Sequence, residues 1–494
     1  MAIKKSQLYS SLWASCDELR GGMDASQYKD YVLVLLFIKY ISDKYAWVPF
    51  APITIPVGSS FKDMVELKWK PTIGDDINKK IIAPIKEANK LSEMPDFDNE
   101  EKLGSGPDKV KKLSNLIAIF EDPALDFSKN RAEWDDILGD AYEYLMKHFA
   151  SESGKSKWQF YTPAEVSRIM AKVIGIWKTK DKTPTVYDPT CGSWSLLLRV
   201  AGETDSNVWL YWQEMDVATA ALARMNMILH DNPTAIIEQG NTLSTPLFLD
   251  WERLKTFDYV VANPPFSFKS WSNGLQDPDK FGRFKDFWTP PEKNGDYAFL
   301  LHIIHSLKTT GKWACILPHG VLFRWNAEAE IRKNIIKRWY IKGIIWLPPN
   351  LFYGTGIPAC IIILDKENAE NRKGIFMIDA GKSYIKDGNK NRLRSQDLHK
   401  IVDVFTKQLE LPKYSRIVSI TEIEKNEYNL NIPRYIDSGE LEDIQDIEAH
   451  LLWGMPNIDI ENLWNYWDVY PTLRKALFEP SKRSGYSQLL ITQD

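Results

Sequence analysis

A strand, a tight turn and a helix follow one another in the segment VYDPTCGSWSLLLRV (residues 186–200). The β-prone residues before Asp188 predict the end of a strand, and Ser195 starts the apolar face of a predicted helix. Loops of this kind hold nucleotide-like cofactors, because small residues let the ligand approach the backbone at a helix N-terminus. The segment therefore predicts a cofactor loop, in which Trp194 is an unexpectedly large side chain.

Strand-like and helical segments alternate on both sides of this loop. The predicted strands are 185–188, 208–214, 235–241, 257–265, 312–318, 341–348 and 359–364, and the predicted helices are 163–176, 195–202, 216–229, 294–309 and 327–338. Such alternation predicts an α/β fold, with a doubly wound and mainly parallel sheet.

Three regions follow from the sequence pattern. Residues 1–150 are mainly helical in pattern and show no catalytic cluster, which predicts a helical N-terminal domain that docks a partner or DNA. The small polar segment 151–157 is a predicted linker. We expect the catalytic domain over 151–400 and a C-terminal subunit-interaction region over 401–494.

Composition narrows the possible functions. The 494 residues are 44% hydrophobic and 26% charged, which is typical of a soluble globular protein. The net charge of −4 argues against a strongly basic, stand-alone DNA binder, so a partner would supply much of the phosphate contact. The four cysteines are widely spaced and form no CxxC pair, which argues against a zinc site or a disulfide framework. This pattern favours a reducing cytoplasm. We expect no membrane span, because no apolar run approaches about 18 residues. We expect no signal peptide, because no apolar h-region follows the N-terminal lysines.

The strongest short motif is Asn263-Pro264-Pro265-Phe266, directly after the predicted strand FDYVVA. Two consecutive prolines remove two backbone donors and stiffen the turn. They leave carbonyl groups at the carboxyl edge of a parallel sheet, where ligands bind in such folds. The side-chain carbonyl of Asn263 and the backbone carbonyl of Pro264 can hold both hydrogens of an exocyclic amine, and Phe266 can stack on the base that carries it.

Three further side chains fit the same edge of the sheet. Glu214 ends the second predicted strand, where an acidic residue bonds ribose hydroxyls. Asn241 ends the third predicted strand, where a polar side chain can reach an adenine ring. Thr162 is a predicted helix cap. Together with the loop at Asp188, these residues predict a nucleotide-like cofactor site.

The motifs in combination resemble those of the adenine-N6 DNA methyltransferases, in particular the modification (M) subunit of type I restriction-modification systems. The resemblance is carried by QFYTPAEVSRIM, DPTCGS, QE, QGNTL and VVANPPF. It extends to LYSSLWASCDELRGGMDASQYKDYVLVLLFIKYISD, LPPNLFYGTGIPACI and YNLNIPRY, so it runs nearly from end to end.

This resemblance implies the S-adenosylmethionine-dependent methyltransferase fold, with S-adenosylmethionine as methyl donor and N6 of adenine as acceptor. The transfer would be direct, and no metal is implied. The motifs and the resemblance together give these cofactor-binding residues: Gln159, Phe160, Tyr161, Thr162, Pro163, Ala164, Asp188, Thr190, Cys191, Gly192, Ser193, Glu214 and Asn241. The expected catalytic residues are Asn263, Pro264, Pro265 and Phe266.

The resemblance also implies partners. These are double-stranded DNA, a specificity (S) subunit that reads its sequence, with two M subunits for each S, and a restriction (R) subunit. Two alternatives stay open, because Asn-Pro-Pro-aromatic motifs also serve methyltransferases of cytosine N4 or of protein glutamine, and a non-catalytic DNA-associated scaffold would keep the fold. The helical N-terminus and the FYTP segment favour the adenine enzyme.

Tryptophan is unusually frequent and glycine unusually rare. The chain has 19 tryptophans, and its 26 glycines are about 5% of the residues, against roughly 7% in an average protein. Tryptophan stands where the resemblance leads us to suspect glycine at Trp47, Trp69, Trp134, Trp158, Trp194, Trp212, Trp288, Trp325, Trp339, Trp346 and Trp453. Independent point mutations would rarely repeat one substitution so often. We therefore hypothesise a reassigned codon, normally a stop, that the host reads as glycine and another code translates as tryptophan.

Overall fold

The computed structural model describes most of the chain. The described residues are 5–20, 25–91, 94–129, 144–145, 162–192, 195–229, 235–276, 279–352, 356–388, 390–438 and 446–490. The chain divides into two compact units, residues 1–437 and residues 438–494. Within the described residues, none of the helices combines the length and the apolar character that crossing a membrane requires.

The N-terminal part is helical, as the sequence pattern predicts. Its elements are α1 (Lys5–Leu19), α2 (Ala25–Tyr45), α3 (Phe61–Val65), α4 (Ile73–Asp76), η1 (Ile77–Ile82), α5 (Ala83–Asn89), α6 (Glu100–Leu103), α7 (Gly106–Phe120), η2 (Pro123–Leu125) and η3 (Phe127–Lys129). The apolar run of α2 is buried throughout from Tyr31 to Ile38. Ser60 and Asp63 form a capping box at the start of α3. The end of the predicted helical domain, residues 130–150, lies outside the described residues apart from 144–145.

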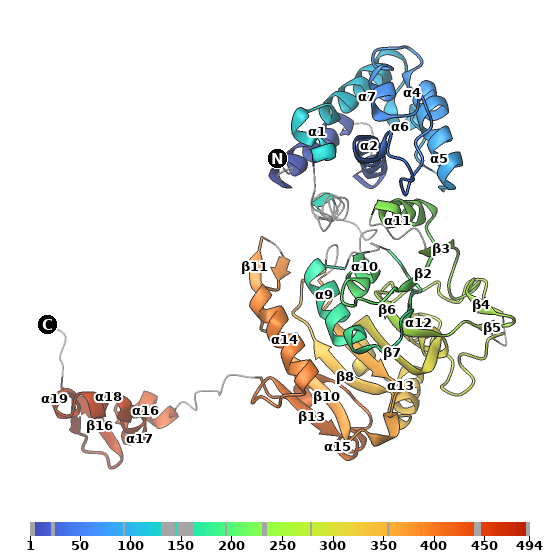
Figure 1. The fold of residues 1–494 in the computed structure, drawn as a ribbon. Coiled ribbons are helices and arrows are strands. Elements are labelled where there is room, and N and C mark those ends of the chain that lie inside the picture. Colours follow the sequence, from blue (N-terminus) through green and yellow to red (C-terminus); the bar gives the residue numbers. More distant parts are fainter. Residues whose placement is uncertain are drawn as a thin grey trace. The chain divides into compact units, whose positions relative to one another are not determined.

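A nine-stranded mixed sheet forms the centre of the next part (Figure 1). Its strands are β1 (Thr185–Asp188), β2 (Trp209–Glu214), β3 (Ile236–Gln239), β6 (Phe257–Ala262), β7 (Leu307–Pro318), β8 (Ile341–Trp346), β9 (Ala359–Asp365), β10 (Gly374–Asp379) and β13 (Ser415–Ser419). Their order is β13-β10-β8-β9-β7-β6-β1-β2-β3. Only β9 and β13 run antiparallel to their neighbours, so the mainly parallel sheet is confirmed.

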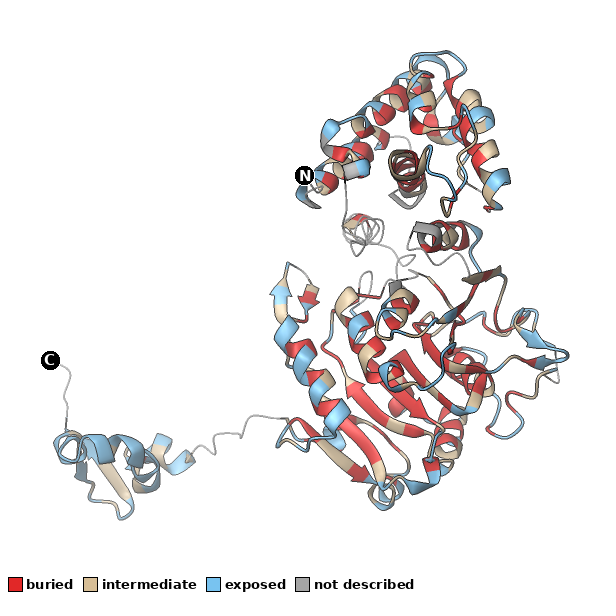
Figure 2. Ribbon diagram, in the orientation of Figure 1, coloured by how far each residue is buried: buried red, intermediate tan, exposed pale blue. Residues whose placement is uncertain are grey.

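Helices cover both faces of this sheet. They are α9 (Ala164–Val173), α10 (Ser195–Ala201), α11 (Val217–Leu229), α12 (Asp296–His305), α13 (Ala327–Lys337), α14 (Ser395–Lys407) and α15 (Ile420–Lys425). Strand side chains alternate between two cores: Val261 packs in the core that contains α9 and α14, and its neighbours Val260 and Ala262 pack in the core of α12 and α13. Burial is most continuous along these strands (Figure 2). The doubly wound arrangement is therefore confirmed.

Short elements complete the described chain. Two small hairpins are formed by β4 (Leu249–Asp250) with β5 (Arg253–Leu254) and by β11 (Ile385–Asp387) with β12 (Lys390–Arg392), and the 3-10 turns are η4 (Ile176–Lys178), η5 (His319–Leu322), η6 (Ala369–Asn371) and η7 (Ile432–Arg434). The second unit contains α16 (Ile447–Leu452), β14 (Met455–Pro456), α17 (Asn457–Asn462), α18 (Trp464–Val469), α19 (Leu473–Leu477), β15 (Phe478–Pro480) and β16 (Tyr486–Leu489).

Six described tryptophans have a backbone conformation that favours glycine. Their φ angles lie between 56° and 121°, at Trp47, Trp69, Trp251, Trp288, Trp339 and Trp453. A residue with a Cβ atom in the left-handed region loses roughly 1–2 kcal/mol, whereas glycine adopts it freely. Five of the six are suspected glycines from the sequence, so the backbone supports the hypothesis at these positions.

The local geometry explains why glycine belongs at two of the six positions. Trp339 follows α13 and its N–H donates to the carbonyl of Ile336, at the helix end where glycine in the left-handed conformation is common. Trp251 is the first residue of the two-residue turn between β4 and β5, where a type II′ hairpin takes glycine. Trp251 was not among the suspected positions, and the structure adds it to them.

The other suspected positions have a different character. Trp212 and Trp346 lie within β2 and β8, and Trp325 has no left-handed φ, so the backbone does not demand glycine at these three. Trp134, Trp158 and Trp194 lie outside the described residues. The backbone conformation therefore supports glycine at only five of the eleven suspected positions.

We expect Trp339→Gly to raise the free energy of unfolding by about 1 kcal/mol, because relief of the left-handed strain exceeds the added chain entropy. Chemical denaturation measures the change. The control is Trp177→Gly, because Trp177 is a tryptophan in the same unit that has no left-handed φ, and this change should give no gain. Equal losses of stability in both variants would contradict the strain argument.

Candidate cofactor and substrate site

Four neighbouring parallel strands end at one edge of the sheet, and the predicted site residues lie there. The strand order places the carboxyl ends of β6, β1, β2 and β3 side by side. Asp188 is the last residue of β1, Glu214 is the last residue of β2, and Asn263 directly follows β6. The topology thus brings together side chains that are up to 75 residues apart in sequence.

The loop after β1 is closed by hydrogen bonds to carboxylates. Asp188 is buried, and its Oδ1 accepts from the backbone N–H of Thr190 at 2.9 Å. Gly192 has a φ of 45°, a conformation that favours glycine, and its N–H donates to Oε2 of Glu214 at 2.9 Å. The other carboxylate oxygen, Oε1, accepts from the N–H of Asp216 at 2.9 Å. The structure therefore joins Asp188, Thr190, Gly192 and Glu214 in one compact loop cluster.

The electrostatics of this cluster favour a cationic ligand. Burial raises the pKa of Asp188 to about 7, with the charge of Glu214 adding to the effect and the Thr190 N–H opposing it. Burial also raises the pKa of Glu214. Among the described residues, neither carboxylate forms an ion pair with a lysine, arginine or histidine. A bound positive charge would stabilise both ionised forms.

Cys191 contributes backbone contacts to the same loop. Its N–H donates to the carbonyl of Gln213 at 3.3 Å. Burial raises the pKa of its thiol well above the usual range, so the side chain is a neutral, apolar group.

The loop after β3 is tied to the loop after β1 by a residue that the sequence analysis did not single out. Thr242 Oγ1 donates to the carbonyl of Pro189 at 2.5 Å. Asn241, by contrast, turns its side-chain oxygen to its own loop, where it accepts from the N–H of Leu243 at 2.9 Å. The buried side chain of Gln213 bonds the same loop through Gly240. A polar residue inside a buried strand was the available signal for Gln213.

Asn263 is held by Thr162. The two side chains are buried, and Nδ2 of Asn263 donates to Oγ1 of Thr162 at 2.9 Å. The prediction that Thr162 caps the following helix is wrong, because α9 has Pro163 at its N-cap position, with Ala164 as its first residue. The Thr162 hydroxyl instead accepts a hydrogen bond from the Asn263 amide and so holds that side chain in place.

The turn after Asn263 is held from two sides. The ring of Phe266 meets the ring of Phe352 edge-on, with 5.7 Å between centroids. The next residue, Ser267, has a φ of 53°, and its N–H donates to Oδ1 of Asp296 at 2.7 Å. Arg324 Nη1 donates to Oδ2 of the same fully buried Asp296 at 2.8 Å. The charged Asp296 at the start of an apolar helix was the signal that the sequence analysis missed.

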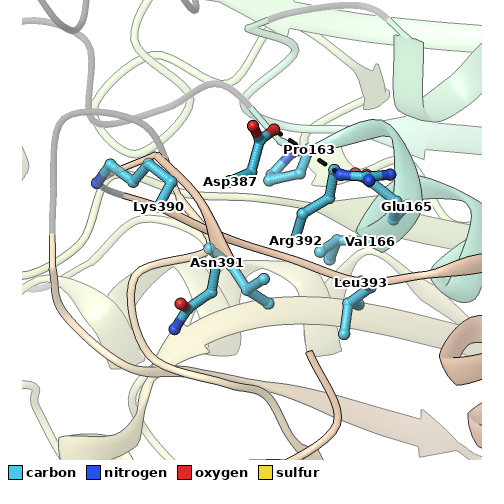
Figure 3. A pocket seen from close by; sticks show the side chains of 9 residues that line it. Pro163, Glu165, Val166, Asp387, Lys390, Asn391, Arg392 and Leu393 are labelled. Carbon is cyan, nitrogen blue, oxygen red and sulfur yellow. Dashed lines mark ion pairs between the residues drawn. The ribbon is translucent and has the colours of Figure 1, made fainter. Parts of the chain in front are cut away.

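A pocket adjoins this turn. Figure 3 shows it between the start of α9, the loop after β8 and the β11–β12 hairpin. Its lining residues are Pro163, Glu165, Val166, Leu351, Asp387, Lys390, Asn391, Arg392 and Leu393. Pro163 directly follows Thr162, so the pocket lies beside the contact that holds Asn263.

The remaining predicted site residues divide into two groups. Pro264 is buried and Pro265 is half-buried, in the irregular segment that follows β6. Gln159, Phe160, Tyr161 and Ser193 lie outside the described residues, as does Trp194 in the same loop. In the part of the chain that the structure describes, no three acidic, histidine or cysteine side chains cluster as a metal site would require.

Comparisons with known proteins agree with this architecture. The family model "N-6 DNA Methylase" matches residues 133–444, and the model "HsdM N-terminal domain" matches residues 8–120. The methylase subunit of the type I restriction enzyme MpnII from Mycoplasma pneumoniae is 31% identical, covering 89% of this chain and 90% of the relative. That of the MjaVII enzyme from Methanocaldococcus jannaschii is 30% identical, covering 90% and 80%.

A solved structure is also similar. It is the crystal structure of the methyltransferase subunit of a type I restriction-modification system from Streptococcus thermophilus, with 32% identity and a TM-score of 0.75. The match covers 88% of this chain and all of the other.

We expect the raised pKa of Asp188 to make the ligand-free protein less stable as pH rises. The Asp188 carboxyl has a pKa of about 3.9 in the unfolded chain and about 7 in the folded protein, so the folded state holds this proton more tightly. The contribution of this proton to the free energy of unfolding is fully present below about pH 4 and is lost as the pH rises through about 7. Denaturant unfolding of the wild type and Asp188→Asn between pH 4 and pH 8 measures it. A stability difference between the two proteins that does not change with pH would contradict the assignment.

Proposed function

This chain belongs to the N-6 DNA methylase family and is a modification subunit of the type I restriction-enzyme class. We therefore propose that the residues at the carboxyl edge of its sheet catalyse methylation of a flipped adenine. The protein is an S-adenosylmethionine-dependent DNA methyltransferase. The proposal adds the residues and their roles. The observation that carries it is the buried hydrogen bond between Thr162 and Asn263, which orients the Asn263 amide at the carboxyl edge.

The cluster at the ends of β1 and β2 fits the cofactor. S-adenosylmethionine, when bound, supplies an electrophilic methyl group on a positively charged sulfur. Asp188 is buried and Glu214 is partly buried, and the raised pKa values of both carboxyl groups favour a cationic ligand. Gly192 allows close approach of a ligand to the loop backbone, because no Cβ atom is present there. We assign the ribose hydroxyls to Glu214, whose oxygens keep further lone pairs, and the adenine ring to the region of Asn241.

The turn after β6 fits the amine that receives the methyl group. Nδ2 of Asn263 donates to Thr162, which makes Oδ1 the end of the amide that accepts an amine hydrogen. The carbonyl of Pro264 accepts the second hydrogen. Two accepting oxygens direct the nitrogen lone pair toward the methyl group and stabilise the positive charge that develops on nitrogen. No covalent enzyme intermediate is needed.

Phe266 provides an aromatic surface for the base. Turning an adenine out of the duplex has an unstacking cost of a few kcal/mol, which stacking on Phe266 and the bonds at Asn263 offset. The Phe352 ring and the Asp296–Arg324 pair hold the segment around Phe266 in place. The aromatic ring is therefore preorganised by groups that need not touch the base.

The partners follow from the family and the charge balance. We assign sequence reading and part of the phosphate contact to an S subunit, with two copies of this chain for each S, and DNA cleavage to an R subunit. A net charge of −4 is consistent with this division, because a lone DNA-binding domain is usually basic.

We expect Asn263→Ala to lower kcat by about 100-fold or more, because one carbonyl that stabilises the developing charge is lost. The assay combines the protein with its S subunit and a duplex containing the recognised site, and mass spectrometry identifies the methylated base. The dissociation constant of the cofactor should stay within a few-fold. Thr162→Val should lower kcat in the same direction, and Thr162→Ser, which keeps the hydroxyl, should retain most activity. A methylated cytosine, or an Asn263→Ala rate within threefold of wild type, would contradict the proposal.

We also expect Trp194→Gly to increase cofactor affinity and methyl transfer, because an indole in a cofactor loop crowds the ligand. Labelled S-adenosylmethionine and the matching S subunit provide the assay for both proteins.

Sequencing the codons at 194 and 288 tests the recoding hypothesis directly. Ordinary UGG codons there would refute that hypothesis whatever the activities are.

A further inference from the structure

The β11–β12 hairpin and the segments on both sides of it form a basic region in an acidic chain. Residues 380–400 contain six lysines and arginines but only two aspartates, whereas the whole chain has a net charge of −4. We call the hairpin, Ile385–Arg392, the basic hairpin. Lys386 and Arg392 are exposed on it, one on each strand.

The two exposed cations differ from their neighbours, which have structural contacts. Arg394 forms two short bonds with Asp397, from Nε at 2.8 Å and from Nη2 at 2.9 Å, at the start of α14. Lys390 donates from Nζ to the carbonyl of Phe352 at 2.8 Å. Arg392 reaches Asp387 only at 3.8 Å, with both side chains about half exposed, and such a pair contributes little. Lys386 and Arg392 therefore remain able to bind an external anion.

The basic hairpin is anchored beside the proposed catalytic turn. The N–H of Asn391 donates to the carbonyl of Asn350 at 3.0 Å, and its Nδ2 donates to the carbonyl of Pro349 at 2.6 Å. The same loop contains Phe352, whose ring contacts Phe266. Two contacts thus connect the hairpin with the aromatic ring on which we propose that the base stacks. Figure 3 shows Asn391, Lys390 and Arg392 around the pocket at this place.

We propose that Lys386 and Arg392 bind the DNA phosphate backbone next to the flipped adenine. The inference rests on the proposed function, because a base that enters the site at Phe266 brings its own flanking phosphates to the mouth of that site. Contacts of this kind fix the position of the protein on the duplex without reading sequence. None of the described residues of the basic hairpin is a large exposed hydrophobic, so its exposed surface offers charge rather than an apolar patch.

The test is the salt dependence of DNA binding by the double variant Lys386→Ala/Arg392→Ala, assembled with its S subunit. Each lost phosphate contact reduces the slope of log K against log salt by about 0.9. We therefore expect the slope to fall by about 1 to 2 and KM for DNA to rise, with kcat at saturating DNA and the cofactor dissociation constant nearly unchanged. The matched control is Lys180→Ala/Lys182→Ala, which removes two exposed lysines before β1, at the opposite edge of the sheet.

Three results would overturn the inference. An unchanged salt slope in the Lys386/Arg392 variant, with wild-type methylation intact, would remove the phosphate contact and leave the proposed function standing. An equal fall in the control would show a general charge effect. Loss of S-subunit association in size-exclusion chromatography would assign the basic hairpin to the subunit interface. If the wild-type complex methylates no adenine, the proposed function itself fails, which is a distinguishable outcome.

Discussion

The carboxyl edge of the parallel strands holds two carboxylates, the buried Asp188 and the partly buried Glu214, without a described cationic partner, and this constraint shapes the rest of the site. Burying an ionised carboxyl is unfavourable unless hydrogen bonds or a charge offset it. Backbone N–H groups from Thr190, Gly192 and Asp216 offset part of it. The pKa of Asp188 nevertheless stays raised, because burial outweighs these hydrogen bonds. A bound positive charge would favour the ionised forms of both carboxyl groups.

The substrate side of the site is assembled from segments that are distant in sequence. Thr162 orients Asn263 across 101 residues, and Phe352 meets Phe266 across more than 80. Each contact holds a polar or aromatic group to which we assign a role in the proposed reaction, and such preorganisation is how an enzyme contributes alignment. The basic hairpin extends the same series of contacts outward to the surface.

Sequence reasoning predicted the parts of this site that depend on local pattern. The ends of β1, β2 and β6 place Asp188, Glu214 and Asn263, and strand periodicity is enough to find them. Thr162 was assigned to a helix cap, because a threonine before a proline and a helix fits that pattern locally, and only the tertiary structure shows its hydroxyl on Asn263. Thr242, Asp296 and Arg324 were missed for the same reason. The strands β10 and β13 were also missed, although the apolar run within β10 was a usable signal.

The tryptophans with left-handed backbones bear on the identity of the chain itself. Six such residues at roughly 1–2 kcal/mol each would remove about 6–12 kcal/mol, which is comparable to the whole free energy of unfolding of a typical domain. Packing does not offset this loss at Trp47 or Trp453, because their side chains are 88% and 84% exposed. A chain with glycine at these positions keeps the same backbone without the strain. Since Trp251 was identified from its φ and its hairpin turn, and not from the resemblance, it is an independent argument that the backbone was selected with glycine in place.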